Sequence, residues 1–182
     1  LGGRRIIKKE TWKMAVDSIQ HIIDEASPVN TKFSIEPMPW MIPTGPDEYL
    51  RLIGDVDREA FGVHMDLINM VNCPQRYFFA EEFMEECFSK LKGRILSCHI
   101  KDVLLLNEFT FQLRECACGE GTLPLEKYAQ LATAENPDMP MIIEHLHSDE
   151  EYLQSLSYLQ KLSIVRVDGS KNRVATTFPS SS

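Results

Sequence analysis

The chain has 182 residues, a formal net charge of −8 and a pI near 5.1. Because binding to a nucleic-acid backbone or an anionic membrane surface needs a positive face, this acidic balance argues against both functions. With 43% hydrophobic residues, the chain can bury a substantial core, and we expect one globular unit. It has neither the roughly 20-residue apolar run of a membrane span nor the apolar start of a signal peptide, so we expect a cytoplasmic protein.

Strand and helix patterns alternate along the chain. Apolar residues between Glu10 and Ala26 recur at helical spacing and predict an amphipathic helix. Four strands are then predicted, at 32–36, 61–66, 95–100 and 139–144. Helical patterns follow them at 46–53, 79–91, 125–132 and from Ser148 onward. We therefore expect four strand-helix units after the first helix.

Two segments lie outside this regular alternation of strands and helices. The stretch from Asn107 to Gly121 is expected to be irregular, and residues 169–182 are expected to form a polar tail. Ser148 and Glu151 have the spacing of a capping box. The helix that follows them offers four leucines for its buried side: Leu153, Leu156, Leu159 and Leu162.

The five cysteines are odd in number and lack the spacing of a small secreted framework, so we expect reduced thiols. Cys116 and Cys118 suggest a metal clip. Structural zinc sites need about four ligands, however, and no second pair of this kind follows. Thiols without metal are therefore the preferred interpretation.

Each predicted strand ends near a potential metal ligand: Glu36, Asp66, His99 and Glu144. The order of elements requires a parallel sheet with right-handed crossovers, which an open doubly wound sheet also satisfies. An open sheet would spread four adjacent strand ends over roughly 14 Å, whereas a closed barrel brings them together. We therefore predict an α/β fold of the (β/α)₈ barrel type.

A whole barrel of this kind runs to about 250 residues, and only four strand-helix units are visible. We therefore expect residues 1–168 to form the carboxy-terminal half, strands 5 to 8, and an amino-terminal half to precede them. Four strands alone would leave two unpaired edges. A half barrel that pairs with another copy would also satisfy those edges, and we expect a homo-oligomer.

Three carboxylates and one imidazole form a hard, oxygen-rich ligand set. This set suits Mn²⁺, Mg²⁺ or Co²⁺ better than structural zinc, which prefers thiolates and imidazoles. Strand ends are where barrels build their active sites, and carboxylates buried there need compensating charge. We therefore predict one divalent ion, with Mn²⁺ as the first choice and Mg²⁺, Co²⁺ or Zn²⁺ as alternatives.

The chain resembles the xylose-isomerase-like superfamily of TIM barrels, in particular the sugar phosphate isomerase/epimerase group that includes tagatose and psicose 3-epimerases. The resemblance covers most of the chain and rests on these segments in the family's order and spacing: Ser34-Ile35-Glu36-Pro37, Gly62-Val63-His64-Met65-Asp66, Ser97-Cys98-His99-Ile100-Lys101-Asp102, Gly119-Glu120-Gly121 and Ile142-Ile143-Glu144-His145-Leu146. It implies that the four strand-end ligands hold one divalent ion. It also implies that Glu36 and Glu144 are the catalytic acid and base.

The chemistry implied by this resemblance is coherent. The ion would act as a Lewis acid on a carbonyl and a neighbouring hydroxyl and stabilise the enediolate formed by proton removal. Return of a proton to the opposite face gives epimerisation, and return at the neighbouring carbon gives isomerisation. The sequence does not decide between these outcomes.

Five further residues are candidates for substrate binding: His64, Asn69, Lys101, Arg114 and Trp40. His64 and Lys101 lie two positions from a predicted ligand and so share its side of the strand. Each also has a structural interpretation: His64 could be a packed histidine, and Lys101 could form an ion pair with Asp102. Trp40 could equally be an exposed loop aromatic or a dimer contact. The turn at Gly119-Glu120-Gly121 could approach a phosphate or a sugar hydroxyl.

Asn69 is a departure from the epimerases, which carry a histidine at that position. This difference counts against a rival function, phosphodiester hydrolysis. Apurinic-site endonucleases of this superfamily use that histidine and others to build a three-metal cluster. No His-x-Asp or Asp-x-His motif follows His99, and the acidic chain offers little to hold DNA. We therefore expect a sugar or sugar phosphate as the partner, and neither nucleic acid nor membrane. A non-catalytic half barrel is the third alternative.

Overall fold

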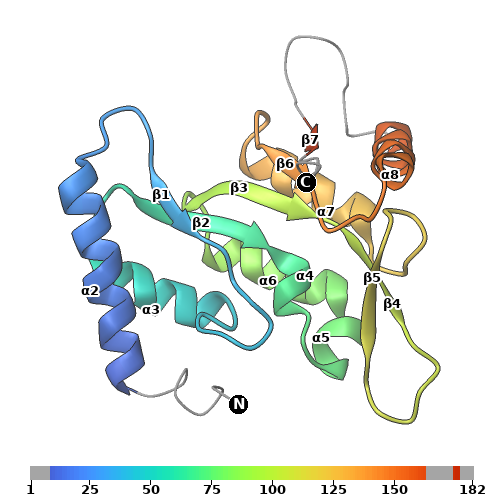
Figure 1. Cartoon of the computed structure of the whole chain (residues 1–182), viewed down its shortest axis with the longest axis horizontal. Helices are drawn as coiled ribbons and strands as arrows, with labels where there is room; N and C mark the ends of the chain where they lie inside the picture. Colours follow the sequence, from blue (N-terminus) through green and yellow to red (C-terminus); the bar gives the residue numbers. More distant parts are fainter. Residues whose placement is uncertain (1–8, 163–173, 177–182) are drawn as a thin grey trace.

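The computed structural model describes residues 9–162 and 174–176. Within these residues, one parallel sheet has the strand order β1-β2-β3-β6-β7 (Figure 1). Its strands are β1 (Phe33–Ile35), β2 (Phe61–Asp66), β3 (Ile95–Ile100), β6 (Met141–Ile143) and β7 (Val174–Thr176). The four predicted strands are confirmed, and β2 and β3 have the predicted bounds.

Helices alternate with the strands as predicted. The longer ones are α2 (Lys9–Ala26), α3 (Pro46–Val56), α6 (Ala80–Lys90), α7 (Leu125–Glu135) and α8 (Asp149–Lys161), and the short ones are α4 (Leu67–Met70) and α5 (Pro74–Phe78). Helix α3 contacts β2 and α7 contacts β3, while neighbouring helices contact one another in the order α2, α3, α6, α7. Their buried side chains form the main core against the sheet. None of the helices in this described region is long and apolar enough to cross a membrane.

Helix α8 begins as its sequence predicts but buries a different face. The Ser148 hydroxyl accepts a hydrogen bond from the backbone N–H of Glu151 at 3.3 Å, which confirms the cap. The buried residues are Tyr152, Ser155 and Leu159. Leu153 is 59% exposed, so its predicted place on the buried side is wrong. The buried face follows the i, i+3, i+7 spacing of Tyr152, and Leu153 is rotated about 100° from it.

The stretch after β3 contains a hairpin that the sequence did not predict. Strands β4 (Asp102–Leu105) and β5 (Leu113–Cys116) pair antiparallel and extend away from the main sheet (Figure 1). The expectation that residues 107–121 are irregular is therefore wrong for β5. Its Leu-Arg-Glu-Cys sequence carries two charges among four residues and gives no alternating apolar pattern.

The expected polar tail, residues 169–182, includes a strand. Val174–Thr176 forms β7, which pairs in parallel with β6. The rest of that tail lies outside the described residues.

Two buried tyrosines tie neighbouring strands together where they approach their carboxyl ends. Tyr49 of α3 donates its hydroxyl proton to the carbonyl of Ile35 at 2.9 Å. Tyr128 of α7 shares its proton between the carbonyls of Met65 and His99, each at 3.0 Å. Both side chains are fully buried. The helices therefore support the strand ends through hydrogen bonds as well as apolar packing.

We predict that Tyr128→Phe lowers the free energy of unfolding by about 1–3 kcal/mol, because two buried carbonyls lose their donor while the packing is kept. Urea denaturation measures this loss. The matched control is Tyr77→Phe, which removes a solvent-exposed hydrogen bond to Thr122 and should change stability by less than about 0.5 kcal/mol. Equal losses in the two variants would contradict the prediction.

Candidate metal centre

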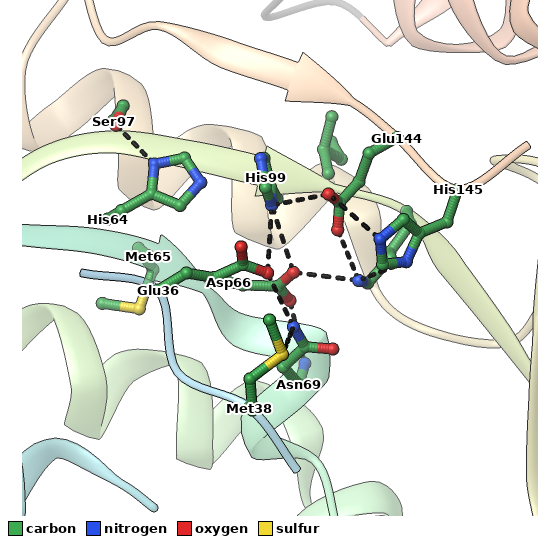
Figure 2. Close-up of polar contacts among 12 residues, drawn as sticks. Glu36, Met38, His64, Met65, Asp66, Asn69, Ser97, His99, Glu144 and His145 are labelled. Carbon is green, nitrogen blue, oxygen red and sulfur yellow. Dashed lines mark hydrogen bonds and ion pairs between the residues drawn. The ribbon is translucent and has the colours of Figure 1, made fainter. Parts of the chain in front are cut away.

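The four predicted ligands converge at the carboxyl ends of the parallel strands. Glu36 directly follows β1, Asp66 ends β2, His99 lies in β3, and Glu144 directly follows β6. One ligand atom from each lies within 4.8 Å of all the others (Figure 2). Opposite ligands of Mg²⁺ lie about 4.2 Å apart, so one divalent ion fits after small side-chain adjustments.

The His99 ring stands at the middle of this cluster. Its Nδ1 atom lies 3.0 Å from Glu144 Oε2, 3.3 Å from Asp66 Oδ2 and 3.5 Å from Glu36 Oε1. Burial lowers the pKa of His99, but its hydrogen bonds to Asp66 and Glu144 outweigh this effect and raise the pKa to about 9. A histidine that ligates a metal is neutral, so binding of a divalent ion at this cluster competes with protonation of His99.

The carboxylates have different electrostatic surroundings. Burial and the neighbouring charges of Asp66 and Glu144 raise the pKa of Glu36. Burial also raises the pKa of Asp66, but contacts with His99 and Lys101 prevail and hold it well below its usual value. Glu36 therefore takes up a proton more readily than Asp66. A difference in pKa between neighbouring carboxyl groups is typical of sites for acid–base catalysis.

Lys101 is a buried cation at the edge of the cluster. Its Nζ atom lies 2.6 Å from Glu144 Oε1, 2.9 Å from Asp66 Oδ2 and 3.1 Å from Glu115 Oε1. The residue is only 1% exposed, and these carboxylates raise the pKa of its ammonium group above the usual value. The structural ion pair considered for Lys101 therefore involves these acids and not Asp102.

Two residues next to Lys101 were not among the predicted site residues. Glu115 reaches the ammonium from β5, and His145 Nδ1 lies 3.0 Å from Glu115 Oε2. His145 has φ of 60°, a left-handed conformation that is uncommon outside glycine. Only its place directly after Glu144 gave a sequence signal, whereas Glu115 depends on the unpredicted hairpin.

His64 packs against a ligand instead of lying free. Its ring meets His99 edge to face, with centroids 4.0 Å apart and planes at 80°. Its Nδ1 lies 2.5 Å from Ser97 Oγ, while its Nε2 is buried and has no hydrogen-bond partner among the described residues (Figure 2). Burial and the nearby charge of His99 lower the pKa of His64 to about 4. His64 is therefore a neutral ring that fixes the orientation of His99.

Asn69 holds two of the ligands. Its backbone N–H donates to Asp66 Oδ1 at 2.8 Å, which makes Asp66 the N-cap of α4. Its side-chain Nδ2 donates to Glu36 Oε1 at 2.9 Å. Asn69 thus lies within the centre, in contact with Glu36 and Asp66.

The remaining predicted residues lie farther out. Trp40 is 70% exposed and lines a cavity together with Asn69. Arg114 is exposed on β5 and, by strand alternation, points to the opposite side from its neighbour Glu115. The structure therefore does not bring Arg114 to the four ligands.

The turn at Gly119-Glu120-Gly121 is held from inside the protein. The buried Asp102 carboxylate accepts hydrogen bonds from four backbone N–H groups, those of Val103, Gly119, Gly121 and Leu123. A Cβ atom on Gly121 would lie 2.2 Å from Asp102 Oδ1. Because the two glycine amides are used within the protein, the turn anchors the hairpin, and we no longer expect it to bind phosphate. Cys116 and Cys118 are free thiols.

Comparison with known families places the chain. Residues 2–162 match the model of the family described as xylose isomerase-like TIM barrel. The chain belongs to this family. The match covers most of the chain and agrees with the parallel sheet and the convergence of its strand ends. A search of curated proteins gave no match.

Solved structures of this family show the same fold. A xylose isomerase-like TIM barrel protein from Mycobacterium smegmatis in complex with magnesium has TM-score 0.67 and 19% identity, covering 86% of this chain and 52% of that one. A D-psicose 3-epimerase from Clostridium cellulolyticum H10, solved with D-tagatose, has TM-score 0.58 and 14% identity, covering 88% and 49%. A probable 3-DHS dehydratase from Bacillus anthracis has TM-score 0.64 and 14% identity, covering 84% and 57%.

These likenesses establish the fold. The chain spans about half the length of these solved relatives, which agrees with the predicted half barrel. The relatives named include an epimerase and a probable dehydratase, so the shared fold does not assign one reaction to this chain.

We predict that His64→Ala lowers the affinity for Mn²⁺ by about tenfold, because loss of a contact that orients a ligand typically costs 10- to 100-fold. His64→Phe keeps a ring against His99 and should stay within about threefold of the unmodified protein. Isothermal titration with MnCl₂ measures both affinities, and circular dichroism checks that each variant is folded. Unchanged affinity in the folded alanine variant would contradict the positioning role.

Proposed function

We propose that this chain supplies the ion-binding and acid–base residues of a sugar or sugar phosphate isomerase or epimerase that depends on one divalent ion, with Mn²⁺ as the first choice. The observation that carries the proposal is the arrangement of Glu36 and Glu144. They follow β1 and β6, the strands on either side of the β2–β3 pair, so their carboxylates approach the ligand cluster from two sides. A cytoplasmic location and a homo-oligomer are part of this proposal.

A bound divalent ion would supply Lewis acidity, which stabilises negative charge on a substrate oxygen. The protein's own residues would hold the reactants in place. Asp66 is kept ionised by His99 and Lys101, and Asn69 fixes both Asp66 and Glu36 by hydrogen bonds. The acid–base groups therefore start from defined positions, which lowers the entropic part of the barrier.

Proton transfer is assigned to the two glutamates. Glu144 is held by the Lys101 ammonium at 2.6 Å, which fixes the position of the carboxylate, and we assign to it the removal of a proton next to a carbonyl. Glu36 has a raised pKa, which suits it to return a proton. Return to the opposite face of the same carbon gives the epimer, and return to the neighbouring carbon gives the isomer.

Lys101 favours this chemistry over phosphodiester cleavage with a metal cluster. Three ligand carboxylates, one ammonium and one divalent ion are together neutral. A second ion would need free carboxylate oxygens, but the ammonium already contacts Glu144 Oε1 and Asp66 Oδ2. In the part of the chain that the structure describes, no other cluster of potential metal ligands occurs. The centre therefore suits one ion.

We predict that the chain binds one Mn²⁺ ion and that Glu144→Gln weakens this binding by at least about 100-fold, because loss of even an outer contact costs 10- to 100-fold. Titration calorimetry and metal analysis measure affinity and stoichiometry. Glu108→Gln, an exposed glutamate in the hairpin region, is the matched control and should bind like the unmodified chain. Absence of binding in the unmodified chain would overturn the metal centre.

We further predict substrate-dependent exchange of carbon-bound hydrogen with solvent. The Mn²⁺-loaded protein is incubated in D₂O with a panel of ketoses and aldoses, and the ion is removed before NMR. Deuterium next to the carbonyl of one sugar, lost in Glu36→Gln, supports the proposal. Ion binding without exchange would favour a non-catalytic half barrel, and cleavage of abasic duplex DNA would favour the phosphodiesterase alternative.

A further inference from the structure

A cavity of about 360 Å³ lies beside the metal centre. Two of its lining residues contact groups of the centre directly. Asn69 Nδ2 donates to Glu36 Oε1 at 2.9 Å, and Glu115 Oε1 lies 3.1 Å from Lys101 Nζ. A substrate with its reacting carbons at the ligand cluster would therefore extend its far end into this cavity.

The cavity walls are mainly apolar. Ile68 is 5% exposed at its inner side, and Trp40, Phe111 and Leu113 line the remainder. Phe111 is held by Tyr77, whose ring lies 6.0 Å away at 66°. Leu113 belongs to β5, so the unpredicted hairpin supplies part of this wall. Such a surface gains free energy by covering C–H groups and loses it by burying unpaired hydroxyls.

The charge around the cavity is negative. Among the residues that the structure describes, the lining includes no lysine, arginine or histidine, and Glu115 is its one charged residue. Even with one divalent ion bound and Lys101 protonated, the three ligand carboxylates and Glu115 leave a net charge of about −1. The amide groups of Asn69 and Asn72 already donate to Glu36 and to the carbonyl of Pro39. A phosphate would meet repulsion there without a cationic partner.

We propose that this cavity binds the end of the substrate distant from the reacting carbons and selects an uncharged, apolar end. The substrate class is a deoxy or methyl-bearing sugar, in preference to a sugar phosphate. This inference rests on the proposed function and deepens it, because it chooses between the phosphorylated and unphosphorylated substrates that the proposal leaves open.

The test uses ligands that differ only at C6. For each D-ketohexose, the parent sugar, its 6-deoxy derivative and its 6-phosphate are titrated into the Mg²⁺-loaded chain, and tryptophan fluorescence is recorded. Trp40 lines the cavity, whereas Trp12 is buried in the separate cluster around α2 and α3. A Trp40→Phe variant therefore identifies the part of the signal that comes from the cavity.

We expect at least one ketohexose for which affinity falls from the 6-deoxy sugar to the parent and then to the 6-phosphate. Covering one methyl group corresponds to about fourfold in affinity. The 6-phosphate should bind at least about tenfold more weakly than the 6-deoxy sugar, because it adds charge repulsion. Equal or tighter binding of the phosphates, or no binding of any member of the series, would overturn the inference.

A second variant makes the charge argument testable. Leu113→Lys places an ammonium group at the partly buried wall, and its long stem can stay in contact with apolar surface. It should raise the affinity for the 6-phosphate by at least about fivefold, whereas Leu113→Met should not. If neither variant changes phosphate affinity, the cavity does not set the substrate class.

Failure of this inference is distinguishable from failure of the proposed function. Mg²⁺ affinity is measured separately in the same variants, and Leu113 is not one of the four candidate ligands. If the chain binds the metal and catalyses hydrogen exchange but prefers phosphorylated sugars, only the assignment of the cavity is overturned. If the unmodified chain does not bind the metal, the proposed function itself is overturned.

Discussion

The close approach of three carboxylates is the constraint on which the rest of this structure depends. Glu36, Asp66 and Glu144 place ligand atoms within 4.8 Å of one another, and Asp66 is fully buried. Like charges at such distances, removed from water, are strongly unfavourable unless opposite charge compensates them. Lys101 provides part of that compensation within the chain, and a divalent ion held by the carboxylates and a neutral His99 would complete it.

The scaffold keeps this cluster in place from two directions. Tyr49 and Tyr128 reach from the helices to the carbonyls of the strand ends, so the backbone that carries the ligands is fixed by hydrogen bonds. On the other side, the hairpin is anchored by Asp102 and brings Glu115 to Lys101. The same hairpin carries Leu113 in the cavity wall, so ion centre and cavity are parts of one structure.

In barrel enzymes, the ligands at the strand ends typically form a common centre, and the loops around them vary. Ligands at strand ends are supported by the sheet, which changes little between relatives, while the segments after the strands shape the rest of the pocket. The relatives named above share this fold, and one is an epimerase whereas another is a probable dehydratase. The specificity that we propose for this chain therefore depends on the hairpin after β3.

The sequence by itself determined four strands of the parallel sheet, β1, β2, β3 and β6, their order, and the four candidate ligands at their carboxyl ends. Apolar patterns of four to six residues are local signals, and the position of Glu36 or His99 at a strand end follows from them directly. Parallel order then forces these ends to one edge, so the ligand cluster could be predicted without coordinates. The N-cap of α8 was predicted for the same reason, because Ser148 and Glu151 are three residues apart.

Only the tertiary structure decided what surrounds the ligands. Glu115 meets Lys101 because β4 and β5 pair, and the edge-to-face contact of His64 with His99 depends on the parallel pairing of β2 with β3. The exposed position of Leu153 depends on which face of α8 packs against its neighbours. These contacts join residues far apart in the chain, and their energies come from packing and charge compensation that no local pattern encodes.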